Sequence, residues 1–169
     1  MVTLVVPCEK YLKSYKEAYA EYQDAGVSTY GMTDAESVDI FKKHENYRLG
    51  RNLKPGRVPS DCYWLVDEEK VYFIGEIHIR HRLNETLSLR GGHIGYVIRY
   101  AEWNRGYGTH MLSLALAKAK AMGLEKVLIT CDEGNIASAR VMEKNGCIYT
   151  DTVDCEDGSR TKRYWKWLK

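Results

Sequence analysis

The stretch Glu102–Asn135, "EWNRGYGTHMLSLALAKAKAMGLEKVLITCDEGN", decides the fold. Gly106 and Gly108 flank a tyrosine directly before an alanine- and leucine-rich segment, and the β-branched run "KVLITC" follows. Apolar residues recur at helical spacing after the glycines, which predicts an amphipathic helix that begins at Thr109 and packs on a sheet. The order of glycine turn, helix and strand therefore predicts a helix N-terminus that is held at a fixed place beside the sheet.

The first turn of this helix is suited to an anion. Its backbone N–H groups lack helical partners and carry partial positive charge. Gly106 and Gly108 also lack the side chains that would keep a phosphate away. If the preceding strand, "YVIRY", splays from "KVLITC", its free backbone groups can pair with an extended ligand that bears amides. A pyrophosphate joined to a peptide-like arm is coenzyme A. Because a glycine pair before a helix is a weak signal alone, this inference depends on the joint pattern.

Composition limits the remaining classes. A chain of 169 residues, 44% hydrophobic, predicts one globular domain over residues 1–169. The net charge of +2 disfavours a nucleic-acid partner. The five cysteines are odd in number and form no CxxC pair, which argues against a disulfide framework and against a zinc site. No apolar run is long enough to span a membrane. We expect a soluble cytoplasmic protein with no metal and no nucleic-acid or membrane partner.

The segments outside this stretch alternate between helix and strand patterns. Tyrosines at helical spacing predict a first helix from Tyr11 to Gly26. Thr33 and Glu36 form a possible capping box ahead of a second helix that ends near Tyr47. Aromatic and β-branched residues predict antiparallel strands in "DCYWLVD", "KVYFIGEIHIRHRL" and "GGHIGYVIRY", and a closing hairpin in "CIYTDTV" and "RTKRYWKWLK". The fold class is α/β (α+β), with a central, mostly antiparallel mixed sheet.

Three segments resemble one known family. The chain is similar to the core of the GNAT superfamily of acetyl-CoA-dependent N-acetyltransferases in the run "YVIRYAEWNRGYGTHML", in the strand after its helix, and in "NIASARVMEKNG". The resemblance covers roughly Val71 to Ile148. It implies a GNAT-like sheet that is splayed at the cofactor site and flanked by about four helices. The family's loop pattern is Gln or Arg, then any two residues, Gly, any one residue, and Gly or Ala. This pattern aligns with Trp103 to Gly108. Trp103 departs from that pattern, and Tyr100 stands where a proline is common.

The resemblance also implies a set of cofactor contacts. Loop amides would hold the pyrophosphate, the backbone of the preceding strand would pair with pantetheine, and one asparagine would touch the cofactor arm. Taken alone, Asn135 is better explained as a helix N-cap, and its place one strand after the glycine loop is what favours a cofactor role. The predicted acetyl-CoA contacts are Tyr96, Val97, Ile98, Asn104, Arg105, Gly106, Tyr107, Gly108, Thr109 and Asn135.

The catalytic residues are less clear from the sequence. An amine has a pKa near ~10 and must lose a proton before it attacks a thioester. Met142 stands where many GNAT members carry a tyrosine acid, and Thr130 where some carry a glutamate base. The remaining candidates for a base are His93, Glu76 and Glu85. Taken alone, His93 is better explained as a structural histidine bonded to the backbone, and Glu76 is also compatible with a side chain that faces solvent.

The sequence therefore predicts transfer of an acetyl group from acetyl-CoA to a primary amine. We expect a small-molecule acceptor rather than a protein, and a monomer or homodimer. A catalytically weak acyl-CoA-binding sensor or scaffold is the alternative, because the usual acid and base are missing. A nucleotide-binding regulatory domain is disfavoured, since no acidic residue follows at the spacing that a dinucleotide fold needs.

Overall fold

The computed structural model describes residues 1–169, and its strands form one seven-stranded sheet in the order β1-β2-β3-β4-β5-β7-β6. The strands are β1 (Val2–Val5), β2 (Ser60–Asp67), β3 (Tyr72–Arg80), β4 (Ile94–Ile98), β5 (Lys126–Asp132), β6 (Ile148–Asp154) and β7 (Arg160–Trp167). Neighbouring strands are antiparallel except β4 and β5, which are parallel. The predicted mostly antiparallel mixed sheet is confirmed.

Helices cover both faces of the sheet. They are α1 (Leu12–Ala25), α2 (Ile40–Leu49), α3 (Glu85–Leu89), α4 (Tyr107–Ala121) and α5 (Ile136–Lys144). The sequence pattern does not predict α3, because so short a helix shows no periodicity; the side chain of Asn84 caps it by accepting the amide of Leu87 at 2.9 Å. None of these helices combines the length and the apolar character that crossing a membrane requires.

Two helix starts differ from the prediction. The capping box is wrong, because Asp39 is the N-cap of α2 and its carboxylate accepts the amide of Lys42 at 3.0 Å. Thr33 instead accepts a hydrogen bond from Lys43 Nζ at 2.6 Å, ahead of the helix. The helix α4 begins at Tyr107, two residues earlier than expected, so the glycine turn itself enters the helix.

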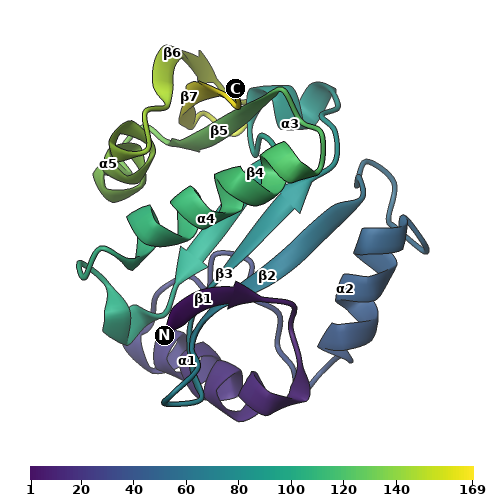
Figure 1. Cartoon of the computed structure of the whole chain (residues 1–169). Helices are drawn as coiled ribbons and strands as arrows, with labels where there is room; N and C mark the ends of the chain where they lie inside the picture. The colour runs from purple at the N-terminus through teal and green to yellow at the C-terminus, as the bar shows by residue number, and fades with distance from the viewer.

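The two faces have separate apolar cores. The helices α1 and α2 pack on one face of β2, β3 and β4 around Trp64, and the ring of Tyr15 stacks on that indole with centroids 4.7 Å apart. Three tyrosines of the predicted first helix, Tyr11, Tyr15 and Tyr22, are therefore buried in this core. The helices α4 and α5 cover the other face, where Leu65, Ile77 and Met111 are buried. Figure 1 shows α4 crossing in front of the central strands.

The sheet opens between β4 and β5. These strands pair at a single position, Ile94 with Ile129, and β4 has no strand partner on that side further along. In Figure 1, β5 leads away from β4 toward β6 and β7. The splay that the resemblance implied is therefore present, and it lies beside the turn that leads into α4.

Candidate active site

The glycine loop and the first turn of α4 carry a run of unpaired backbone N–H groups. None of the consecutive amides from Asn104 to Thr109 donates to a protein acceptor, and no side chain caps the helix. Gly106 is the N-cap residue, and its φ of 82° lies in the left-handed region that glycine tolerates. Free amides at a helix N-terminus form an anion site. This run contains the loop residues that the sequence assigned to the pyrophosphate, namely Asn104, Arg105, Gly106, Tyr107, Gly108 and Thr109.

The edge of β4 that faces β5 offers free backbone groups. The carbonyl of His93 accepts an amide from β3, and the amide of Arg99 donates to a carbonyl of β3, each at 2.7 Å. Because backbone groups alternate along a strand, the N–H and C=O of Tyr96 and Ile98 point toward β5, whereas those of Val97 point to β3. Of the three predicted pantetheine contacts, Tyr96 and Ile98 have backbone groups on the open edge.

An aromatic cluster closes the end of this edge. The carbonyl of Ile98 accepts the indole Nε1–H of Trp103 at 3.0 Å and also the hydroxyl of Tyr22 on α1. The rings of Trp103 and Tyr100 lie 4.9 Å apart. The two departures from the family's loop pattern therefore pack together at the end of β4. Trp103 and Tyr22 occupy the carbonyl of Ile98 and leave its amide and both backbone groups of Tyr96 for a ligand.

Asn135 and the hydroxyl of Ser138 lie across the gap from β4, and the hydroxyl of Tyr96 extends from β4 toward Ser138. Asn135 is the N-cap of α5; its Oδ1 accepts the amide of Ser138 at 3.0 Å, and its Nδ2 has no partner within the protein. The hydroxyl of Tyr96 lies 2.8 Å from Ser138 Oγ, which joins β4 to α5. Burial raises the pKa of Tyr96, so its phenol stays protonated. The sequence did not indicate this hydroxyl pair, because a strand tyrosine and a helix serine have no fixed spacing.

We expect Asn135→Asp to keep α5 and to weaken acetyl-CoA binding about tenfold. A carboxylate caps a helix as well as an amide does, but it cannot donate, and one lost hydrogen bond of ~1.4 kcal/mol is a factor of ten. Calorimetric titration of both proteins with acetyl-CoA measures the difference, and circular dichroism checks the helix content. Equal affinities would leave Asn135 as a helix cap alone.

His93 lies at the vertex of the splay. Its backbone amide donates to the carbonyl of Leu128 at 2.7 Å, and its Nδ1 accepts the amide of Leu128 at 2.9 Å. Because Nδ1 is an acceptor, the ring proton is on Nε2. Burial, with the nearby charge of Arg80, lowers the pKa of His93 and keeps the ring neutral. His93 thus binds both the carbonyl and the amide of Leu128 on β5. This is the geometry of a structural histidine.

The two candidate carboxylates have different surroundings. Glu85 is exposed in the first turn of α3. Glu76 on β3 is only 2% exposed, so it does not face solvent. Its Oε2 accepts the indole N–H of Trp64 at 2.8 Å, and its Oε1 lies 2.9 Å from Nε2 of His78. Both oxygens of Glu76 are therefore engaged within the protein.

A buried polar cluster surrounds Glu76. Burial alone would raise the pKa of the Glu76 carboxyl, but His78 and, less strongly, His44 and Trp64 outweigh it, so this pKa lies below its usual value. Burial lowers the pKa of His44 to about 4, so that imidazole is neutral. Nε2 of His44 lies 3.8 Å from Glu76 and 3.7 Å from Sγ of Cys62. Sequence spacing did not reveal this cluster, because its members come from α2, β2 and β3.

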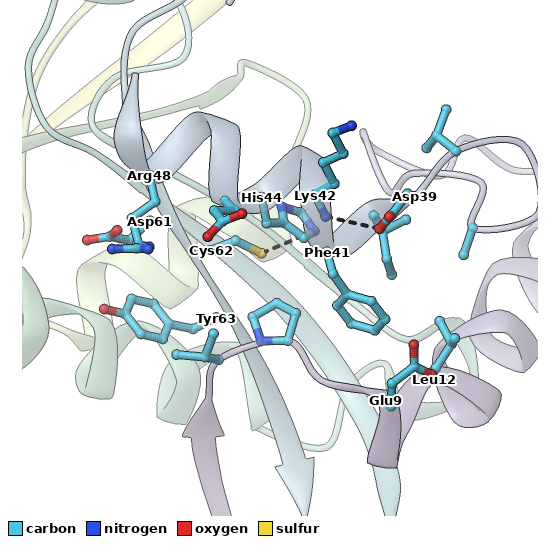
Figure 2. A pocket seen from close by; sticks show the side chains of 16 residues that line it. Glu9, Leu12, Asp39, Phe41, Lys42, His44, Arg48, Asp61, Cys62 and Tyr63 are labelled. Atoms are coloured by element: carbon cyan, nitrogen blue, oxygen red, sulfur yellow. Dashed lines mark hydrogen bonds between the residues drawn. The ribbon is translucent and has the colours of Figure 1, made fainter. Parts of the chain in front are cut away.

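A pocket of about 840 Å³ lies beside this cluster rather than at the splay. Its walls come from α2, the end of β1 and the start of β2, and they include His44, Cys62 and Phe41 (Figure 2). None of the predicted cofactor contacts lines it. The free amides and the open edge of β4, not this pocket, therefore mark the candidate cofactor site.

A sheet splayed beside a loop of free amides is the arrangement that the resemblance to acetyl-CoA-dependent acetyltransferases implied. The model of the acetyltransferase (GNAT) domain family matches residues 10–148. The chain therefore belongs to the GNAT acetyltransferase family, as its resemblance indicated, and acetyl-CoA is the cosubstrate of that family. No curated protein matches the sequence.

Solved structures share the fold at low sequence identity. A GNAT-family acetyltransferase from Bacillus anthracis aligns with a TM-score of 0.69 and 18% identity, covering 99% of this chain and 95% of the other. The acetyltransferase yncA from Salmonella typhimurium, solved with acetyl-CoA, has a TM-score of 0.66 and 13% identity, covering 99% and 94%. The microcin C7 self-immunity acetyltransferase MccE, in complex with acetyl-CoA and AMP, has a TM-score of 0.70 and 12% identity, covering 98% and 92%.

Proposed function

We propose that this protein transfers an acetyl group from acetyl-CoA directly to a primary amine of a small-molecule acceptor. The observation that carries the proposal is the run of free amides from Asn104 to Thr109, which lies next to an open strand edge in a chain of the GNAT family. The similar structures of yncA and MccE contain acetyl-CoA, which supports the same cofactor here. We propose a cytoplasmic protein that acts as a monomer or homodimer.

The residues at the splay fit the chemistry of acetyl transfer. Acetyl-CoA supplies an acetyl group activated as a thioester. The N–H groups of Tyr96 and Ile98 point into the gap, where they can bind a carbonyl oxygen as it gains negative charge. The protonated hydroxyl of Tyr96, which lies 2.8 Å from Ser138 Oγ, is the proposed donor to the departing thiolate. The attacking nitrogen gives up its proton to water, because Nδ1 of His93 already accepts the amide of Leu128 and Nε2 carries the ring proton.

A thiol-release assay tests this function. Purified protein is incubated with acetyl-CoA and with each member of a panel that covers polyamines, amino acids, aminoglycosides and peptides with free N-termini. Release of free CoA only in the presence of a particular small amine, with a product heavier by one acetyl group in mass spectrometry, supports the proposal. Transfer to peptides alone would move the acceptor class to proteins.

A catalytically weak acyl-CoA sensor or scaffold is the second candidate. It is favoured by Met142, which is buried where many relatives carry an acid, and by Trp103, which occupies the carbonyl of Ile98. If the protein is a sensor or scaffold, acetyl-CoA binds tightly and raises the melting temperature. No amine in the panel then releases CoA above the background rate of hydrolysis.

We expect His93→Ala to lower the free energy of unfolding by about 1–3 kcal/mol, because the buried amide of Leu128 loses its acceptor. Activity should fall about tenfold as the vertex of the splay loosens, since small displacements of reacting groups are costly. Thermal unfolding and the pH profile of kcat/KM measure the two effects.

His93→Asn is the matched control. The amide oxygen of asparagine can accept in place of Nδ1, but it does not titrate near neutral pH. If His93 is a positioning residue, Asn restores stability and activity and leaves the acidic limb of the profile in place. If His93 is the base, Asn restores stability alone and the acidic limb shifts in both variants.

A further inference from the structure

Three metal-binding side chains converge between α2 and the sheet, away from the splay. One ring nitrogen of His44, Sγ of Cys62 and one ring nitrogen of His78 all lie within 4.8 Å of one another. His44 and Cys62 are buried, and His78 is half-buried. Figure 2 shows the His44 ring beside the Cys62 sulfur, joined by their 3.7 Å contact. Imidazole nitrogen and thiolate sulfur are the donors that zinc prefers in proteins.

Glu76 adds a fourth donor to these three. Its Oε1 lies 2.9 Å from Nε2 of His78, and its Oε2 lies 3.8 Å from Nε2 of His44. The indole N–H of Trp64 donates to Oε2 at 2.8 Å and holds the carboxylate toward the cluster, as outer hydrogen bonds do for metal ligands. Zinc bonds of about 2.0–2.3 Å in a tetrahedron separate the donor atoms by about 3.3–3.8 Å. The donor atoms of His44, Cys62 and His78 therefore need to approach one another by at most about 1 Å to reach that spacing.

We propose that this cluster binds one zinc ion through His44, Cys62, Glu76 and His78. A thiolate and a carboxylate carry two negative charges, which the divalent cation neutralises, and two neutral imidazoles complete the tetrahedron. The bound site then has no net charge, which avoids the large cost of an isolated buried ion. Zinc is the expected metal because this mixed sulfur, nitrogen and oxygen set in a tetrahedron suits it.

The surrounding structure provides a route for the ion and a role for it. The pocket of about 840 Å³ is lined by His44 and Cys62, so an ion reaches the cluster from solvent through it. The helix α2 lies between long connections, residues 26–39 and 50–59, and contacts the sheet through apolar packing and through His44. Zinc would fasten α2 to β2 and β3. Because the protein supplies all four ligands, the site is structural rather than catalytic.

Metal analysis of the tag-free protein tests the proposal first. Inductively coupled plasma mass spectrometry should find about one zinc per chain, either as purified or after incubation with zinc and gel filtration. Removal of the ion with a chelator should lower the melting temperature, and added zinc should restore it, because a ligand of the folded state stabilises it. Cobalt in place of zinc should give a thiolate-to-metal charge-transfer band.

Variants decide which side chains hold the metal. Cys62→Ser should abolish the cobalt charge-transfer band, and His78→Gln should weaken zinc binding at least about 100-fold, because even outer-shell changes cost roughly 10- to 100-fold. Cys155→Ser is the matched control, since Cys155 is a free cysteine outside the cluster. The melting-temperature shift with acetyl-CoA shows that each variant is folded, since none of these residues belongs to the glycine loop.

Two results would overturn the zinc site. One is a protein that holds far less than one zinc per chain and gains no stability when zinc is added, which would leave the cluster as a hydrogen-bonded part of the core. The other is metal binding that persists unchanged in both Cys62→Ser and His78→Gln, which would place the ion elsewhere. Neither result bears on acetyl transfer, because the cluster and the splay are tested by different ligands.

Discussion

The Gly108→Asp variant is expected to lose the stabilisation that acetyl-CoA gives the wild-type protein. Gly108 lies in the first turn of α4, among the free amides, and an added Cβ would lie 3.1 Å from Val141 and 3.8 Å from Ile98. A carboxylate there would stand beside the pyrophosphate. Two charges about 4 Å apart interact by ~4 kcal/mol at an effective dielectric constant of about 20, which corresponds to a loss of roughly 100- to 1000-fold in affinity.

Gly108→Asn separates charge from packing. The asparagine side chain has nearly the size of the aspartate side chain, and its Cβ would meet Val141 at the same distance, but it carries no charge. The melting temperature of the three proteins is measured with and without acetyl-CoA. We expect a large shift in wild type, a reduced shift in Asn and none in Asp. Equal melting-temperature shifts in Gly108→Asn and Gly108→Asp would mean that the steric effect of the side chain acts without its charge. A full shift in Gly108→Asp would contradict the assignment of the pyrophosphate to this loop.

Features that depend on local sequence were predicted well. The apolar spacing after Gly108 indicated α4, because one face of a helix packs on the sheet whatever its distant partners are. The same holds for β5 and for Asn135 as the cap of α5. The free amides of the loop are also a local property, since a helix start leaves them unpaired. The family resemblance rests on these local features, which is why it is specific.

Features that depend on distant partners were not predicted. Tyr96 and Ser138 are separated by 42 positions, and His44 and Cys62 by 18. Periodicity tells which face of an element a residue occupies, but not which residue lies opposite. The expectation of no zinc site has a similar limit, because a CxxC pair reveals only ligands from one short segment and says nothing about ligands from separate elements. The capping box failed since Asp39, nearer to the apolar run, competes for the helix start.

The Tyr96→Phe variant is expected to lower kcat about 100-fold and to leave acetyl-CoA affinity within about twofold. Phenylalanine keeps the ring in the gap and removes only the hydroxyl that faces Ser138. General acid assistance is typically worth about 10² to 10⁴ in rate. We expect the lower end, because burial raises the pKa of Tyr96 above that of a thiol, near ~8.5, so the hydroxyl stabilises the thiolate by a hydrogen bond and keeps its own proton.

Ser138→Ala is the companion variant. It removes Oγ, but the carbonyl of Ser138 still lies 3.4 Å from the Tyr96 hydroxyl and keeps that group near its place. We therefore expect a smaller loss in kcat, about tenfold, and little change in stability. A rapid-quench assay with acetyl-CoA and the best amine gives kcat, and calorimetry gives the affinity for acetyl-CoA.

The division between kcat and affinity distinguishes a catalytic hydroxyl from a structural one. A hydroxyl that donates to the departing thiolate acts only as the carbon–sulfur bond breaks, so its removal lowers kcat and spares the binding of acetyl-CoA and the melting temperature. A hydroxyl that merely joins β4 to α5 would, when removed, widen the gap and lower affinity and melting temperature together. Unchanged kcat in Tyr96→Phe would exclude the catalytic role and leave departure of the thiolate to solvent.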